Sequence, residues 1–257
     1  MDILRKELEQ IYAMQELGNE NLDGQEIEAC KQVVNNLIKV TNACYVITDA
    51  SCDHCYLMGG EFMPLLGIGN APYNFKDICS SDEDVIYTRL HPEDLVEKRM
   101  LEYEYFKFVH QLPAEEKLRY KATCRIRIKD AQGQYRVVNN STQIMRPSPL
   151  GKIWLILCSY NLSPEQTMTS EITPRIVNNH SGEIINLSFS EKKQHVLSDR
   201  EKEILLLIKE GNPSKKIADI LGISIHTVNR HRQNILERLS VGNSVEAITA
   251  ATAMGLL

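Results

Sequence analysis

The sequence predicts two units: an α+β unit with an antiparallel five-stranded sheet and helices, then an all-α unit of four short helices. In the first unit, apolar and polar residues alternate strictly over 120–129, which is typical of a strand with one buried face. In the second unit, over 197–257, apolar-periodic runs begin at capping residues and most end near a glycine. Short helices joined by about three to five residues pack compactly, as in a helix-turn-helix.

Length and composition indicate the class of protein. The chain has 257 residues, a formal net charge of −5 and seven cysteines. About 195 residues precede the all-α unit, which is enough for one domain with a hydrophobic core. The N-terminal stretch lacks the apolar region of a signal peptide, and the longest apolar run, 153–158, is too short to span a bilayer. Seven cysteines cannot all pair, so we expect reduced thiols in a cytoplasmic protein.

Hydrophobic periodicity predicts the order of elements in the first unit. Strand 120–129 has an apolar face of Tyr120, Ala122, Cys124, Ile126 and Ile128, and the turn after it contains Asp130 and Gly133. In helix 25–40 the apolar anchors are Ile27, Val34, Leu37 and Ile38. The predicted elements are helices over 2–17 and 25–40, strands over 44–48 and 55–58, a helical, loop-rich stretch over 61–66 and 74–84, a helix over 92–111, and strands over 120–129, 134–145 and 152–161.

Capping residues mark the four helices of the second unit. Ser198 and Glu201 have the spacing of a capping box, directly before an apolar-periodic run that ends at Gly211. Further start and stop signals are Ser214 and Gly222 for the second helix, Ser224 and Leu239 for the third, and Asn243, Glu246 and Gly255 for the fourth. The apolar positions of the second helix are Ile217, Ile220 and Leu221.

The third of these helices has two distinct faces. Its apolar face consists of Ile225, Val228, Ile235, Leu236 and Leu239. Its opposite face consists of His226, Asn229, Arg230, Gln233, Asn234 and Glu237. Arginine can bond guanine with two hydrogen bonds, and asparagine or glutamine can bond adenine in the same way. The polar face therefore predicts a helix that reads the major groove of DNA.

The residues around this helix predict contacts to the DNA backbone. Lys215 and Lys216 open the second helix, where their charges and the free N–H groups suit phosphate. Backbone-positioning roles are expected of Ser224, Thr227, His231 and Arg232, which lie near the helix start or the core edge. From 213 to 238 there are five Lys or Arg and two Asp or Glu, a local charge of +3 in an acidic chain. The alternative is a solvated helix face that binds nothing.

These motifs resemble the LuxR/GerE-type DNA-binding domain over 197–257. The shared residues are Leu197, Ser198, Arg200 and Glu201, then Ile217, Ala218, Leu221, Ile223 and Ser224, then Thr227, Val228, His231, Asn234 and Ile235. The resemblance implies a four-helix domain whose third helix enters the major groove, with base-facing positions at Asn229, Arg230 and Gln233. Members of the family often have lysine where this chain has Asn229, so base preference does not carry over.

The fourth helix suggests a homodimer. Val245, Ile248, Ala251 and Thr252 form a stripe of small residues, and slim helix surfaces allow close helix–helix approach. The resemblance also implies that this helix pairs across a two-fold axis. A symmetric dimer would read two half-sites about one helical turn apart, roughly 10 base pairs. The alternative is that the stripe packs only within its own domain.

The first unit resembles a PAS domain over 25–162, after an N-terminal helical segment, 1–24. The supporting motifs are Leu65-Leu66-Gly67, the run from Leu90 to Asp94 and the Asp130–Gly133 hairpin. The resemblance implies five antiparallel strands with helices on one face, in a module that senses a signal or mediates dimerisation. A lipocalin-like or another ligand-binding α+β fold is the alternative. Residues 163–196 are predicted to connect the two units, with one short strand near 184–189.

The sequence leaves the cofactor unknown and predicts no metal site. The Asn-Cys-Arg-Phe-Leu-Gln segment of flavin-photoadduct PAS domains is absent. His91 and His110 flank the helix where haem-binding PAS domains place a ligand, but a lone histidine there is more often a surface or packing residue. Cys52 and Cys55 have the spacing of half a zinc site or a redox pair, with no second such pair in the chain.

Three functions compete on this evidence. The sequence favours a non-enzymatic, DNA-binding transcriptional regulator that acts as a homodimer, with a small ligand or protein partner for the PAS-like unit. An enzyme that uses Cys52 and Cys55 for thiol–disulfide chemistry is the second. An interaction protein that has lost DNA binding is the third.

Overall fold

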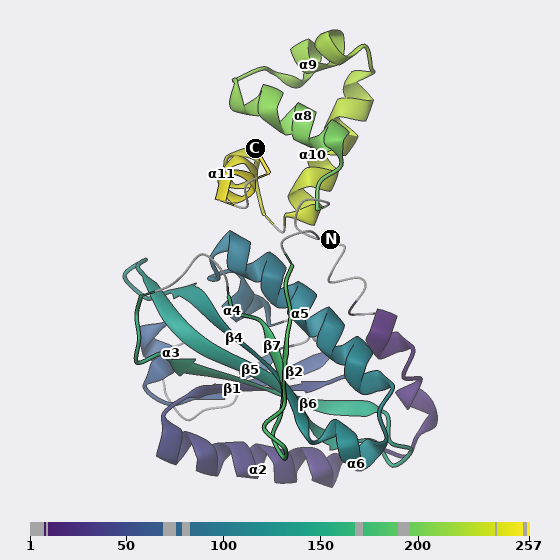
Figure 1. The fold of residues 1–257 in the computed structure, drawn as a ribbon, viewed down its shortest axis with the longest axis vertical. Helices are drawn as coiled ribbons and strands as arrows, with labels where there is room; N and C mark the ends of the chain where they lie inside the picture. Colours follow the sequence, from purple (N-terminus) through teal and green to yellow (C-terminus); the bar gives the residue numbers. More distant parts are fainter. Residues whose placement is uncertain are drawn as a thin grey trace. The chain divides into compact units, whose positions relative to one another are not determined.

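The computed structural model describes residues 8, 10–68, 76–78, 83–167, 172–189, 196–239, 241–253 and 256–257. The chain forms two compact units (Figure 1). The sheet unit comprises residues 7–187, and the helical unit comprises residues 188–257 together with 1–6. Each has buried apolar residues of its own. The sheet unit extends beyond residue 162, where the sequence predicts its end.

A single antiparallel sheet forms the centre of the sheet unit. Its strands are β1 (Cys44–Asp49), β2 (His54–Gly59), β3 (Lys76–Ile78), β4 (Tyr120–Lys129), β5 (Tyr135–Pro147), β6 (Ile153–Leu162), β7 (Arg175–Asn178) and β8 (Ile184–Asn186). They are ordered β3-β2-β1-β6-β5-β4-β7-β8. The central strands pair over long registers, so that Cys44 lies opposite both Gly59 and Tyr160.

The described helices of the sheet unit begin and end at local signals. They are the 3-10 helix η1 (Leu17–Asn19), α2 (Gly24–Thr41), α3 (Phe62–Leu65), α4 (Asp84–Tyr87), α5 (Pro92–His110) and α6 (Ala114–Lys117). The Asp23 side chain accepts a hydrogen bond from the Gln25 N–H and caps α2. Pro92 is the first residue of α5, where a missing N–H costs nothing. None of the described helices is both long and apolar enough to cross a bilayer.

Helices cover both faces of the sheet. On one face, Val34 and Ile38 of α2 are fully buried in an apolar cluster with Ile47 and Leu157. On the other face, Lys98 of α5 lies 5.9 Å from the ring centre of Tyr160, whose side chain is on the opposite side of β6 from Leu157. Figure 1 shows α2 and α5 on opposite sides of the sheet. The expectation of helices on one face only is therefore wrong.

The structure has two strands that the sequence analysis missed, β3 and β7, and it confirms the short strand predicted near 184–189 as β8. β3 lies in the stretch predicted to be helical, and β7 and β8 lie in the predicted connector. The sheet therefore has eight strands among the described residues, not five. β7 pairs with β4, more than 50 residues earlier, and β8 pairs with β7. Strands of three or four residues are too short to show a recognisable alternation. They are stabilised by pairing partners that lie far away in the sequence, which a local pattern does not reveal.

Two further expectations for the first unit need comment. Leu37 was predicted to anchor α2 but is 37% exposed, and Cys30 takes its place in the core beside Val34. The helix predicted over 2–17 falls largely on residues outside the described part. Within that part, residues 10–13 are helical.

The helical unit contains the four predicted helices. They are α8 (Asp199–Lys209), α9 (Ser214–Leu221), α10 (Ile225–Arg238) and α11 (Ser244–Ala253). Its buried apolar residues include Leu197, Ile204, Leu205, Ile217, Val228, Ile235, Leu239, Ala247 and Ala250. α9 differs in one detail: its N-cap is Pro213, and Ser214 is already helical. The predicted stop at Gly255 lies outside the described residues.

Two predicted core residues of the helical unit are exposed. Ile220 in α9 is 51% exposed and Ile225 at the start of α10 is 49% exposed, whereas the neighbouring Ala218 and Val228 are buried. A helical projection shows which residues share a face, but it does not show how far along the helix the neighbouring helices extend. Ile225 is the first residue of its helix, so the projection overestimated its burial.

Candidate nucleic-acid interface

The helical unit is fixed at the start of α8 by a capping box. The Ser198 hydroxyl accepts from the Glu201 N–H at 3.3 Å, and the Glu201 carboxylate accepts from the Ser198 N–H at 2.8 Å. The Glu201 carboxylate, buried at 2% exposure, also lies 3.3 Å from the guanidinium of Arg238 in α10. One carboxylate therefore joins the start of α8 to the end of α10.

Replacing Glu201 with alanine is expected to destabilise the helical unit by about 2 kcal/mol. The reason is that α8 loses a capping hydrogen bond and Arg238 loses its ion-pair partner. Amide hydrogen exchange in the first turn of α8, measured on the full chain, reports the change. Glu203→Ala is the matched control, because Glu203 pairs with Arg200 on the exposed surface and should contribute less than about 1 kcal/mol. Equal effects of the two variants would contradict the role given to Glu201.

The turn between α9 and α10 sets the position of α10. Gly222 ends α9 with φ of 64°, in the left-handed region that favours glycine. The Ser224 hydroxyl then accepts from the Thr227 N–H at 3.0 Å and caps α10. Arg200 of α8 donates to the Leu221 carbonyl at 3.0 Å, at the end of α9. Both ends of the turn are thus fixed by hydrogen bonds within the unit.

α10 presents a polar face to solvent. Asn229, Arg230 and Gln233 are exposed, while Thr227 and Asn234 are partly buried. The Gln233 amide donates to Glu237 at 3.2 Å on the exposed surface. Within the described chain, the side chains of Asn229 and Arg230 have no hydrogen-bond partner. Their donors are therefore available to an outside partner, as the projection predicted.

Arg232 has a structural role that the sequence did not reveal. Its guanidinium donates to the hydroxyl of Ser214 at 3.1 Å and to that of Ser244 at 3.0 Å. Ser214 is the first residue of α9 and Ser244 the first of α11, so Arg232 joins three helices. The neighbouring His231 is partly buried, and its Nδ1 has no hydrogen-bond partner among the described residues. The predicted contacts of both residues to DNA stay predictions.

Lys215 and Lys216 lie in the first turn of α9, and both are exposed. The first N–H groups of a helix lack partners within the helix and add positive potential at this end. Two ammonium groups and free amides at one helix start can hold a phosphate group. The structure is therefore compatible with the expected contact to the DNA backbone.

The four residues predicted for dimerisation differ in exposure. Val245 is 74% exposed, Thr252 is exposed and Ile248 is partly buried. Ala251 is fully buried, so it contributes to the core of its own unit. Val245, Ile248 and Thr252 remain available for pairing, which stays a prediction.

The pair of cysteines at 52 and 55 lacks the features of a reactive thiol pair. Cys55 is fully buried in β2, with its sulfur 3.4 Å from the Thr48 hydroxyl. Cys52 lies in the preceding turn, and neither cysteine forms a disulfide with another described residue. Partial burial, followed by the negative charge of Asp49, raises the pKa of the Cys52 thiol. Because the thiolate is the reactive form, this environment disfavours thiol–disulfide chemistry.

The two histidines at the ends of α5 contact other residues of the sheet unit, His91 the ring of Tyr135 and His110 the side chain of Gln15. Ligand atoms of His91, Glu93 and Asp94 lie within 4.8 Å of one another. Arg127 already supplies a cation to both carboxylates, at 3.1 Å from Glu93 and 3.0 Å from Asp94. Burial, followed by the charge of Arg127, lowers the pKa of His91. A metal ion would have to displace Arg127. His110, at the other end, has its Nδ1 3.1 Å from the Gln15 amide nitrogen.

Sequence reasoning missed a cluster of charged residues between α5 and the sheet. Lys98 is fully buried and donates to the Tyr87 hydroxyl at 2.8 Å and to Glu102. Tyr160 donates to the buried Glu83, whose pKa is raised, mainly by burial. Charged residues occur all around helix 92–110, and since the helix packs on a sheet, some of them had to be buried.

Residues 195–251 match the family model described as "Bacterial regulatory proteins, luxR family". The match covers α8, α9, α10 and most of α11. Two curated relatives are similar over about this length. The "Uncharacterized response regulatory protein YgeK" of Escherichia coli is 45% identical over 60 residues, 23% of this chain and 41% of that protein. The "Transcriptional activator protein AnoR" of Acinetobacter nosocomialis is 43% identical over 61 residues, 24% of this chain and 26% of that protein.

This chain therefore spans less than half the length of these relatives. Among solved structures, a Vibrio cholerae VqmA dimer, described with LuxR-type receptors, is 15% identical over 92% of this chain and 89% of that chain. The TM-score is 0.30, too low to establish a shared arrangement. Residues 195–251, which contain most of the helical unit, are thus similar to the luxR family of bacterial regulatory proteins.

Proposed function

We propose that the protein is a cytoplasmic, dimeric and sequence-specific DNA-binding transcriptional regulator. In this proposal α10 reads the major groove through Asn229, Arg230 and Gln233, and the sheet unit senses a signal or mediates dimerisation. The observation that carries the proposal is the position of these three exposed side chains on a helix whose opposite face is buried in the unit. Arginine and amide side chains are the groups that distinguish guanine and adenine in the major groove.

Contacts to the DNA backbone complete the proposed interface. Lys215 and Lys216 at the start of α9 neutralise phosphates, and Ser224, Thr227, His231, Arg232 and Asn234 contact the backbone or support α10. For the dimer we propose α11, through Val245, Ile248 and Thr252. A two-fold axis there would present two copies of α10 to half-sites about 10 base pairs apart.

For the sheet unit we propose a PAS-like sensory role. Its support is the central antiparallel order β2-β1-β6-β5-β4 with the long helix α5 on one face. α2 on the second face, and β7 and β8 beside β4, are additions to that arrangement. Buried cysteines without disulfides are consistent with a reducing compartment.

The proposal is tested with the full chain, by selecting bound fragments from random genomic DNA and measuring affinity in a shift assay over a range of salt concentrations. Replacing both Lys215 and Lys216 with glutamine is expected to weaken binding to all sequences alike. The slope of log affinity against log salt should fall by about 1.8, since each phosphate contact contributes about 0.9. The reason is that each lysine releases one condensed counterion on binding.

Lys39→Gln with Lys107→Gln is the matched control, because both lysines are exposed and belong to the sheet unit. We expect that control to leave the slope unchanged. Failure of the wild-type chain to bind any duplex at low salt would contradict the regulator proposal. An unchanged slope in the Lys215/Lys216 variant would contradict only the assignment of these two residues.

A further inference from the structure

The face of the sheet that α2 covers is apolar at one end and polar at the other. On β6, Leu157 packs in the cluster under α2, and Ser159 and Asn161 follow on the same side of the strand. Both of these polar residues are partly exposed. The change occurs along β6. The neighbouring strands β4, β5 and β7 also carry polar residues at this end, so the four strands together present a polar sheet surface.

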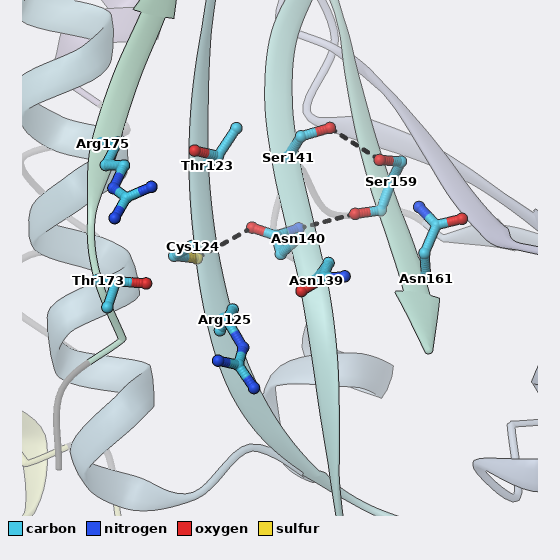
Figure 2. A pocket seen from close by; sticks show the side chains of 10 residues that line it. All are labelled: Thr123, Cys124, Arg125, Asn139, Asn140, Ser141, Ser159, Asn161, Thr173 and Arg175. Atoms are coloured by element: carbon cyan, nitrogen blue, oxygen red, sulfur yellow. Dashed lines mark hydrogen bonds between the residues drawn. The ribbon is translucent and has the colours of Figure 1, made fainter. Parts of the chain in front are cut away.

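Strand pairing places the polar residues in two parallel rows across this surface. The first row runs Arg175, Thr123, Ser141, Ser159. In the second, Arg125 lies opposite Asn139, and Asn139 lies opposite Asn161. Directly opposed residues within a row have Cβ atoms about 5 Å apart, and diagonal neighbours in the two rows are about 7–8 Å apart. Figure 2 shows these side chains lining one hollow, which has a volume of about 320 Å³.

One arginine in this hollow is held rigidly. Arg125 donates to the Glu165 carboxylate at 3.1 Å, and to the carbonyls of Glu165 at 2.9 Å and Thr167 at 3.0 Å. Its Nε is buried and has no hydrogen-bond partner among the described residues. Three hydrogen bonds thus orient the guanidinium, while its buried Nε–H donor stays unused.

The second arginine, Arg175, lies in the other row and is less constrained. Arg175 is exposed, and no described residue forms a hydrogen bond or an ion pair with its side chain. Thr123 and Ser141, beside it in the row, supply hydroxyl groups. None of the residues that line the hollow is acidic, and Glu165 pairs with Arg125 from outside the lining, so the positive potential of the hollow comes mainly from Arg175.

The backbone at the edge of the hollow is strained. Thr173 has φ of 48°, a left-handed conformation that is an outlier for a β-branched residue. Ile172 fixes this conformation, because its carbonyl accepts from the Arg125 N–H at 2.8 Å and its N–H donates to Glu97 at 3.4 Å. The Thr173 side chain lies among those that line the hollow (Figure 2). Strain of this kind costs about 1–3 kcal/mol and is concentrated at ligand sites.

An antiparallel sheet often has one polar face in water, which is the alternative explanation. That explanation accounts for the hydroxyl and amide groups. It does not account for a strained threonine, the exposed Arg175 with no ion-pair partner among the described residues, or the unused buried donor of Arg125 at the same hollow. Ligand sites combine a concave shape with a few convergent polar groups, as here.

We propose that this hollow binds a small, hydroxyl-bearing organic anion. Its carboxylate or phosphate group lies between Arg125 and Arg175, because guanidinium groups match the geometry of these oxyanions. Its hydroxyl groups lie against Asn139, Ser141 and Asn161, which can both donate and accept hydrogen bonds. The inference deepens the proposed sensory role of the sheet unit and does not depend on DNA binding.

The test is isothermal titration of the full chain with D-gluconate, glucose 6-phosphate, inorganic phosphate and glucose. The first two probes supply the carboxylate and the phosphate forms of the same anionic, hydroxyl-bearing chemistry. Saturable binding of either, with none of glucose, is the expected result. Arg175→Gln should weaken that binding about tenfold or more, since a charged hydrogen bond contributes about 1.5–3 kcal/mol.

Arg119→Gln is the matched control, because Arg119 is an exposed arginine of the sheet unit outside the hollow. We expect it to bind the probes as the wild type does. The proposal is overturned if neither gluconate nor glucose 6-phosphate binds, if inorganic phosphate binds as tightly as both, or if Arg175→Gln and Arg119→Gln behave alike. A shift assay on the same variants measures DNA binding separately, so failure of one proposal is distinguishable from failure of the other.

Discussion

Replacing Glu102 with leucine is expected to destabilise the sheet unit by about 3 kcal/mol, because the buried ammonium of Lys98 loses its ion partner. Lys98 is fully buried and bonded to Tyr87 and Glu102. Burial by itself lowers the pKa of Lys98, but the attraction of Glu102 and Glu83 outweighs it and the net shift is upward. The amine is therefore charged in the folded protein, and removing one carboxylate leaves an incompletely compensated charge in the core.

Urea unfolding followed by tryptophan fluorescence measures this effect. Trp154 is the single tryptophan and is buried in the cluster between α2 and the sheet, so its emission reports the sheet unit. Glu115→Leu is the matched control, since Glu115 is exposed on α6 and its replacement should change stability by less than about 0.5 kcal/mol.

A second variant identifies the source of the loss. Lys98→Met combined with Glu102→Leu removes both charges, and such replacements of buried ion pairs are often neutral or stabilising. The double variant should therefore be more stable than Glu102→Leu alone. If it is less stable, the loss comes from altered packing and the explanation by an unpaired charge is wrong.

Replacing Arg230 with alanine is expected to reduce sequence selectivity while leaving most of the non-specific affinity. A bidentate contact between arginine and guanine contributes about 1–3 kcal/mol of discrimination. Selected sites should therefore lose roughly 10- to 100-fold in affinity, and random DNA should lose much less, because the lysines at the start of α9 remain.

The measurement is the ratio of affinities for selected and random duplexes at one salt concentration. Arg119→Ala controls for the loss of a positive charge elsewhere, since Arg119 is exposed in the sheet unit. If Arg230→Ala weakens both duplexes equally, Arg230 contacts phosphate and the base-reading assignment moves to Asn229 or Gln233.

The sequence predicts the helix caps of the helical unit well because their signals are local. The box of Ser198 and Glu201 and the cap at Ser224 depend on residues within one turn, and the structure has both. The sequence does not reveal the contacts between helices that lie apart in the chain. Arg232 joins Ser214 and Ser244, which are 18 and 12 residues away along the chain, and no periodicity contains that information.

The same distinction holds for the sheet unit. β4 has the predicted bounds, because ten alternating residues are a strong period-2 signal. β7 was missed because its four residues are a strand only through pairing with β4. The buried pair of Lys98 and Glu102 was missed because burial of charge depends on partners from other elements, such as Tyr87.

The pairing of β7 with β4 also bears on the tendency of the sheet unit to aggregate through its strand edges. An uncovered ten-residue edge would be a template for association with other chains. Here β7 covers Tyr120 to Thr123, the Ile172 carbonyl accepts from Arg125, and the segment around Leu90 bridges to Ile128. A fragment cut at Leu162 would lose the first two of these covers and expose the edge of β4, so we expect it to aggregate more readily than the full chain.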